Sequence, residues 1–181
     1  MKKTTPEKFE VHYLMESVAF GLTDGIICFL GIIVGVARAT LDPNIVIIAG
    51  IVGGVADALG NSVGFFVSQS TERAVQIYGV EHGTEGRIHS KKEVRMSGLF
   101  SFIATIVALF FLISPFKLIS DILYATVVSF IIGIILAFVL GSYVGKLTKE
   151  NRFKCGLKYA SITIAGALIS YFIGEVLHII I

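Results

Sequence analysis

The sequence has few charged residues and almost no cysteine. Only 15% of its 181 residues are Asp, Glu, Lys or Arg, whereas a soluble domain carries about a quarter. This deficit argues against a soluble globular protein. The two cysteines, Cys28 and Cys155, are too few for a disulfide framework. A net charge of +2 gives no indication of a nucleic-acid partner, and the polar residues after the basic start predict no cleavable signal peptide.

What the sequence has instead is long hydrophobic runs. Hydrophobic residues make up 55% of the chain, and the mean hydropathy is +0.85. About 20 apolar residues in a row are enough to cross a bilayer as a helix. The runs therefore predict an all-α integral membrane protein, a single membrane domain over residues 1–181 with five transmembrane helices. The predicted spans are 17–41, 45–68, 97–116, 122–144 and 157–181, with turns at 42–44 and 114–115 and a long polar loop at 69–96.

The basic residues predict the orientation of these spans. Cytoplasmic segments of membrane proteins carry an excess of Lys and Arg. If the N-terminus is cytoplasmic, only Arg38 and Lys117 of the 15 basic residues lie towards the outside. We therefore expect a multi-pass protein of the cell membrane, with its N-terminus and the 69–96 loop in the cytoplasm and its C-terminus outside.

Two aspartates lie inside the first two predicted spans. Asp24 and Asp57 lie roughly 12 and 17 Å from the cytoplasmic ends of their spans, at ~1.5 Å per helical residue. Each charged aspartate near mid-membrane costs about 2.5–3.5 kcal/mol, and no basic residue lies at the same depth. Asn61 follows Asp57 by one helical turn, so both face the same way. The pattern favours a path for a metal cation or protons, the alternative being protonated carboxyl groups bonded to nearby backbone.

Two motifs in the same spans resemble those of the vacuolar iron transporter family. They are TDGIICFLGIIVGVA at 23–37 and GGVADALGNSVGFFVSQSTER at 53–73. The resemblance implies that the protein is a transporter rather than an enzyme, and that it forms a homodimer. It also implies export of Fe²⁺ or Mn²⁺ from the cytoplasm in exchange for protons, with no resident cofactor. The metal pathway of the family lies between the first two helices at the dimer axis.

The resemblance assigns site residues one by one. Asp24 matches the aspartate of the first helix. Asn61 stands where the family usually has a methionine ligand, Gly53 where it has an acidic residue, and Asp57 where it has a small one. The expected site, Asp24, Asp57 and Asn61, is thus rich in oxygen, which suits Mn²⁺, Fe²⁺ or even Mg²⁺. Cys28, one turn from Asp24, is either a further ligand or a packing residue.

Weaker metal ligands are expected in the 69–96 loop and at the end of the chain. The loop candidates are Glu72, Glu81, His82, Glu85, His89 and Glu93. Because Gly79, Gly83 and Gly86 should interrupt any rigid helix, the loop is expected to be solvated rather than a small metal-collecting site. Glu175 and His178 share one face of the last span. Their place near the outer surface favours contact with water over a role as a metal or proton pair.

Glycines predict how the helices associate. Gly31 and Gly35 in the first span, and Gly60 and Gly64 in the second, have the spacing that lets membrane helices approach closely. We expect a two-fold dimer built on the first helix through Gly31 and Gly35. Two other functions remain open, a non-transporting membrane scaffold and a carrier of a non-metal substrate. An intramembrane aspartyl protease is disfavoured because the motifs of that chemistry are absent.

Overall fold

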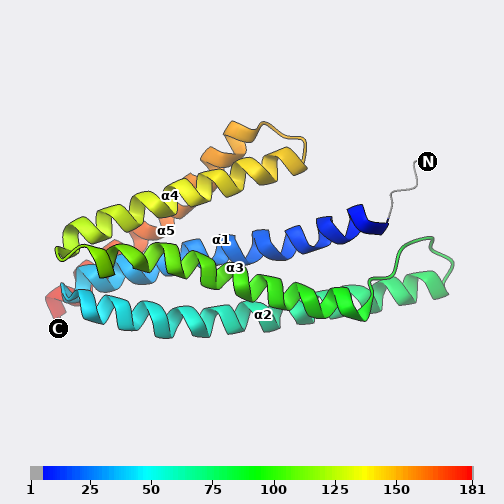
Figure 1. Ribbon diagram of the computed structural model, residues 1–181, viewed down its shortest axis with the longest axis horizontal. Coiled ribbons are helices and arrows are strands. Elements are labelled where there is room, and N and C mark those ends of the chain that lie inside the picture. The colour runs from blue at the N-terminus through cyan, green and yellow to red at the C-terminus, as the bar shows by residue number, and fades with distance from the viewer. Residues whose placement is uncertain (1–5, 181) are drawn as a thin grey trace.

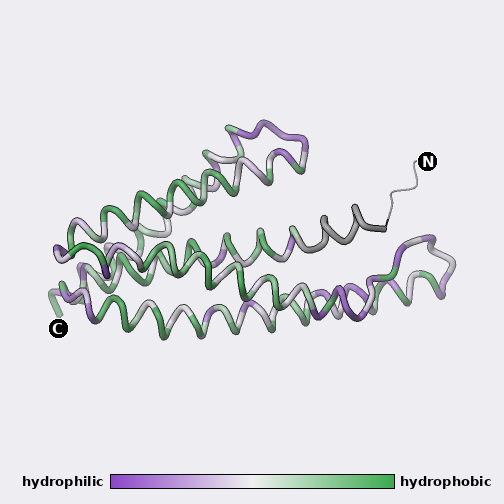
Figure 2. The backbone as a smooth tube through the Cα atoms, viewed as in Figure 1, coloured by the Kyte–Doolittle hydropathy of each residue, from purple (hydrophilic) through white to green (hydrophobic). Residues whose placement is uncertain are grey.

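The computed structural model consists of five long α-helices, and it describes the backbone of residues 6–180 and the side chains of residues 15–180. Each helix is long and apolar enough to cross a membrane, which confirms the predicted fold class. Figure 1 shows the helices side by side, and Figure 2 shows that polar residues gather at the connections. The helices are α1 (Pro6–Thr40), α2 (Pro43–Glu81), α3 (Lys91–Leu118), α4 (Ile122–Leu147) and α5 (Arg152–Ile180).

Short polar side chains begin three of the helices. The side chain of Asp42 accepts a 2.8 Å hydrogen bond from the backbone of Asn44 at the start of α2, and Asp121 caps α4 in the same way. Ser90 begins α3 with a reciprocal capping box to Glu93. Such caps satisfy backbone N–H groups that have no partner within the helix. They therefore fix the residue at which each of these helices begins.

The first helix lies at the centre of the bundle. It packs against each of the other four helices, and Ile26, Phe29, Leu30 and Ile33 on it are almost fully buried. Its approach to α3 is close because Gly21 lies directly on the carbonyl oxygen of Ser101, where a Cβ atom would not fit. A central α1 fixes where Asp24 lies relative to α2.

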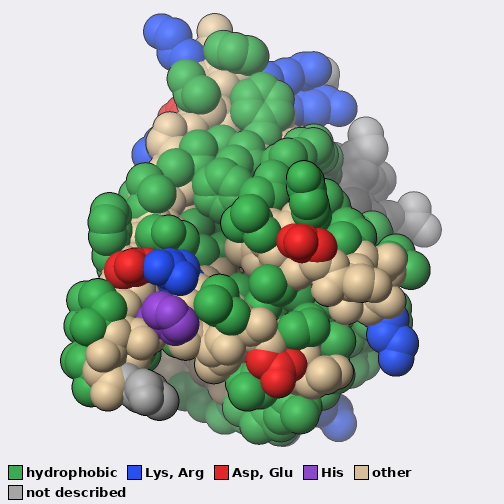
Figure 3. Space-filling view, turned by 90° about the vertical axis from the view of Figure 1, so that its left-hand side faces the viewer, with side chains coloured by type: hydrophobic (Ala, Val, Ile, Leu, Met, Phe, Trp, Pro, Cys, Tyr) green, Lys and Arg blue, Asp and Glu red, His purple; other side chains and the backbone are tan. Residues whose placement is uncertain are grey.

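The connections divide between the two ends of the bundle. The described start of α1 and the α2–α3 and α4–α5 connections lie at one end, and the α1–α2 and α3–α4 turns lie at the other (Figure 1). Figure 3 shows that second end, where hydrophobic side chains outnumber charged ones. The segments with most basic residues therefore share one end of the bundle, as the predicted five-span topology requires. Lys2, Lys3 and Ile181 lie outside the described residues.

The prediction that the polar segment 69–96 is a loop is wrong for most of its length. Helix α2 continues to Glu81, so the connection is only residues 82–90. A single glycine costs a helix about 1 kcal/mol, and Gly79 does not end this one. The helix ends at Glu81, and two residues later Gly83 has a φ of 85°, while the backbone N–H of Thr84 donates a 2.9 Å hydrogen bond to the Gly79 carbonyl. This is the Schellman arrangement, which requires a residue at positive φ.

The predicted turn at Ser114 and Pro115 is also wrong. Pro115 lies inside α3, which ends at Leu118. Proline removes one backbone N–H from a helix and leaves a carbonyl oxygen without its usual donor. The hydroxyl of Ser114 supplies a 3.0 Å hydrogen bond to the Phe111 carbonyl, which is the one that Pro115 leaves without a donor. The hydroxyl therefore lets the helix continue past the proline.

Gly31 and Gly35, the glycines of the expected dimer contact, have a close neighbour within the chain. Both glycines pack within the chain against Ser170 of α5, and a Cβ atom on either would lie within 3.1 Å of that residue. The second glycine pair behaves differently, because a Cβ atom on Gly60 or Gly64 would meet nothing within 4 Å. The small-residue face without a partner, among the residues described, is on α2.

Candidate metal site

The candidate site lies where α1 and α2 run side by side in opposite directions. Asp24 on α1 faces Asn61 on α2, and four residues further along both helices Phe20 packs on Phe65, with ring centroids 5.1 Å apart. The two helices therefore keep a constant register over this stretch. Gly54 leaves room on α2 for Leu109 of α3, because an added Cβ atom there would lie 2.7 Å from Cδ2 of Leu109.

Two carboxylates and one amide meet directly at this level. The Nδ2 atom of Asn61 donates hydrogen bonds to Oδ2 of Asp24 at 2.7 Å and to Oδ2 of Asp57 at 3.2 Å. One amide nitrogen carries two hydrogens, so it can serve both acceptors. The three residues predicted from the sequence thus form one group across two helices.

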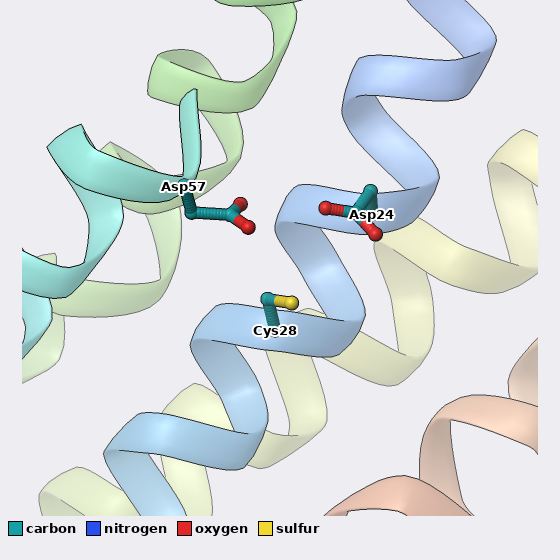
Figure 4. A group of neighbouring side chains, drawn as sticks. All are labelled: Asp24, Cys28 and Asp57. Carbon is teal, nitrogen blue, oxygen red and sulfur yellow. The ribbon is translucent and has the colours of Figure 1, made fainter. Parts of the chain in front are cut away.

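Cys28 joins the same group. Ligand atoms of Asp24, Cys28 and Asp57 all lie within 4.8 Å of one another, and Figure 4 shows the three side chains pointing toward a common space. The position of Cys28 follows from its distance along the chain, since a residue four positions after Asp24 lies on the same face of α1. This spacing is visible in the sequence, but one-turn spacing alone does not distinguish a metal ligand from a packing residue.

The group has no positive neighbour within the described part of the chain. The salt bridges there join Arg38 to Glu175 and Arg87 to Glu93, both away from the site. Asp24, Cys28, Asp57 and Asn61 are all half-buried rather than enclosed. Oxygen donors together with one sulfur suit a divalent transition metal ion, and a charged carboxylate in a membrane usually faces a cavity or a partner.

The profile of the VIT family matches residues 15–85 and 77–175 of the chain. This chain belongs to the VIT family. An uncharacterized protein from Methanocaldococcus jannaschii is 30% identical over 163 residues, which cover 84% of this chain and 84% of the relative. Membership of the VIT family indicates a multi-pass membrane transporter of metal ions rather than an enzyme.

The weaker ligands predicted in the 69–96 segment do not come together in this VIT family member. Glu72, Glu81, His82 and Glu85 are exposed. The His82 ring lies against Tyr78, with Nδ1 2.8 Å from the Tyr78 carbonyl oxygen. Within the described residues, the group of Asp24, Cys28 and Asp57 alone brings three such ligand atoms together.

His89 and Glu93 have structural partners instead. His89 is buried, its backbone N–H donates to the side chain of Gln76 at 2.8 Å, and its carbonyl accepts from Nε of Arg73 at the same distance. Glu93 completes the cap of α3 and forms an ion pair with Arg87. These contacts hold the short α2–α3 connection against α2.

Glu175 and His178 also have partners within the chain. Glu175 forms an ion pair with Arg38 of α1, and Nδ1 of His178 lies 3.0 Å from the Ala39 carbonyl oxygen. Figure 3 shows an acidic, a basic and a histidine side chain next to one another at this end of the bundle. The two residues therefore link α5 to α1. Their i, i+3 spacing indicates only that they share a helix face and does not identify these partners.

Proposed function

We propose that this VIT family member exports Fe²⁺ or Mn²⁺ from the cytoplasm in exchange for protons. Asp24, Asp57 and Asn61 line the path, and Cys28 adds a sulfur ligand. The observation that carries the proposal is the amide of Asn61 between the Asp24 and Asp57 carboxylates, 2.7 and 3.2 Å away, on two membrane-spanning helices. An anionic group of this kind, with no basic partner near it, is suited to a divalent cation.

Charge balance supports exchange with protons. Two carboxylates close together in a medium of low dielectric constant repel each other and are costly to desolvate. A divalent cation neutralises both Asp24 and Asp57. When the cation leaves, protons neutralise them in its place, so that cation and protons occupy the site in turn. This alternation couples the outward movement of metal to the inward movement of protons.

The proposal includes a homodimer that covers the open face of α2. Asp57 is half-buried, and the neighbouring Gly60 and Gly64 have nothing within 4 Å of an added Cβ atom. In a monomer this face would bring a carboxylate close to lipid, which is unfavourable. A second copy packed on these small residues covers the carboxylate and places two copies of the site near one axis.

The dimer is tested by enlarging this face. Gly60→Leu should shift the protein towards monomer in light-scattering chromatography in detergent. Ala165→Leu provides the control, because Ala165 is an exposed small residue on α5. An identical dimer fraction in the two variants would place the interface elsewhere.

The orientation is tested by labelling from one side of the membrane. Glu85 lies in the α2–α3 connection and Lys117 near the end of α3, at opposite ends of the bundle. In a Cys155→Ser background, a membrane-impermeant thiol reagent added outside intact cells should label a cysteine at 117 and not one at 85. Labelling of both positions from the same side would exclude the five-span arrangement.

Transport is tested with purified protein in vesicles. We expect Fe²⁺ and Mn²⁺ movement that depends on a pH gradient, and a loss of tenfold or more in Asp24→Asn and Asp57→Asn. Asp121→Asn is the matched control, since Asp121 caps α4 away from the site and asparagine caps equally well. Wild-type rates in both site variants would contradict the proposal, and an inactive wild type would favour the scaffold or the carrier of a non-metal substrate.

A further inference from the structure

A second polar site lies between α2 and α3 near their cytoplasmic ends, as oriented above. It is a pocket of about 240 Å³ lined by Phe66, Ser70, Arg73, Lys91, Val94 and Arg95. Residues of α2 form one wall and residues of α3 the other. The close approach of the helices below the pocket comes from Gly98, where an added Cβ atom would lie 2.9 Å from the Ser62 carbonyl oxygen.

The charge of this pocket is of one sign. Three of its lining residues are basic and none is acidic. The salt bridges within the described part of the chain are formed by Arg38 and Arg87, not by these three residues. Arg73 is held in place by its Nε hydrogen bond of 2.8 Å to the His89 carbonyl. Three cations around one small space repel each other unless an anion lies between them.

The pocket lies at the boundary between apolar and polar parts of the helices. Phe66 is 40% exposed on α2, and Leu99, one turn beyond Arg95, is 48% exposed on α3. Basic residues begin immediately beyond this level, at Arg73, Lys91 and Arg95. A groove with an apolar lower wall and a basic upper rim matches a phospholipid, whose acyl chains and phosphate group meet at the same depth.

The pocket is separate from the metal site. Phe66 follows Asp57 by nine residues, which is about two and a half turns at 3.6 residues per turn and so places the two residues on opposite sides of the helix. The pocket therefore lies on the opposite side of α2 from the carboxylates and from the glycine face of the proposed dimer. A partner subunit on that face leaves the pocket open to the surrounding lipid.

We propose that this pocket binds the phosphate group of an anionic phospholipid of the cytoplasmic leaflet. Lys91 and Arg95 contact the phosphate, Arg73 closes the rim, and Phe66 and Val94 contact the start of the acyl chains. The apolar wall is the feature that favours a lipid over free phosphate, which has no apolar part to bury. This inference rests on the pocket and on the orientation proposed above, and it does not depend on which ion the protein transports.

Retained lipid provides the first test. The protein is purified from mixed phosphatidylglycerol and phosphatidylcholine and examined by native mass spectrometry. Lys91→Gln with Arg95→Gln should reduce bound phosphatidylglycerol at least threefold. The control, Lys92→Gln with Lys146→Gln, removes the same charge from residues that do not line the pocket. An equal reduction in the control would show a diffuse charge effect and overturn the proposal, as would unchanged retention in the pocket variant.

A second pair of variants tests the pocket without removing a cation. Ser70→Glu places a carboxylate in the pocket and should expel the phosphate. Thr71→Glu adds the same charge at an exposed neighbour outside the pocket and should retain the lipid. Equal retention in the two would overturn the proposal. Displacement of phosphatidylglycerol by millimolar inorganic phosphate alone would likewise overturn the assignment of a lipid in favour of a free anion.

Discussion

Asn61 on α2 donates a 2.7 Å hydrogen bond to Asp24 on α1, which links two residues that are 37 positions apart along the chain. The same nitrogen also reaches Asp57 at 3.2 Å. A neutral amide thus serves as donor to two carboxylates that have no basic partner nearby. The Asn61 amide holds the two carboxylates close enough together for one cation to bind both.

The Asn61 amide should therefore matter for metal affinity. Asn61→Ala removes the donor while both carboxylates remain, and a hydrogen bond to a charged group contributes about 1.5–3 kcal/mol. We expect an increase of roughly tenfold or more in the KM for Mn²⁺ in vesicles. Asn44→Ala, at the exposed start of α2, should leave KM unchanged. An unchanged KM in Asn61→Ala would mean that the bridge is only structural.

Cys28 should determine which ions the site prefers. Cys28→Ser keeps the size of the side chain and replaces sulfur by oxygen, which binds softer ions less well. We expect Cd²⁺ to compete with Mn²⁺ about tenfold less effectively in this variant, with Mn²⁺ transport itself little changed. Cys155→Ser is the control, because Cys155 lies at the start of α5, with Sγ 3.1 Å from a Glu150 carboxylate oxygen. Equal Cd²⁺ competition in wild type and Cys28→Ser would show that Cys28 only packs.

The five helices could be predicted because hydrophobic runs of membrane-spanning length have one main structural solution. The meeting of Asp24 with Asn61 was implied by the family resemblance, but the sequence alone could not give it. Their contact depends on the register of α1 against α2, which side-chain packing sets. The same limit applies to Gly31 and Gly35. Their spacing indicates a close helix contact, but not whether the neighbour is α5 or a second copy.

The errors at Gly79 and Pro115 have a different cause. Both residues are helix breakers by intrinsic preference, and both lie inside helices here. Local hydrogen bonds compensate, such as that from Ser114 to Phe111 beside the proline. Such compensation depends on single side chains, and a rule based on residue type alone misses it.

Gly174 should be essential for the packing of α5 on α1. An added Cβ atom there would collide with the Gly35 carbonyl oxygen, and overpacking typically costs about 1–3 kcal/mol. Gly174→Ala should therefore lower the thermal unfolding midpoint in detergent. Gly166→Ala on the same helix is the control, since its Cβ atom would make an ordinary contact of 3.6 Å with Ile27. Equal midpoints in the two variants would contradict the close contact at Gly174.

The ion pair between Arg38 and Glu175 should act as a unit. The Arg38 guanidinium also lies 5.8 Å from the centre of the Tyr171 ring, so α1 and α5 are joined near the end of the bundle. Removing one partner leaves a charge without its counter-ion, which is worse than removing both. We expect Glu175→Gln to lower the unfolding midpoint, and the double variant Arg38→Gln with Glu175→Gln to recover more than half of that loss.

A double-mutant cycle measures this coupling directly, with Arg38→Gln as the second single variant. Lys117→Gln is the control for charge alone, because Lys117 is an exposed basic residue at the same end of the bundle. It should leave the midpoint unchanged and should show no coupling to Glu175→Gln. Strictly additive effects of Arg38→Gln and Glu175→Gln would mean that the two side chains contribute independently and that the ion pair does not act as a unit.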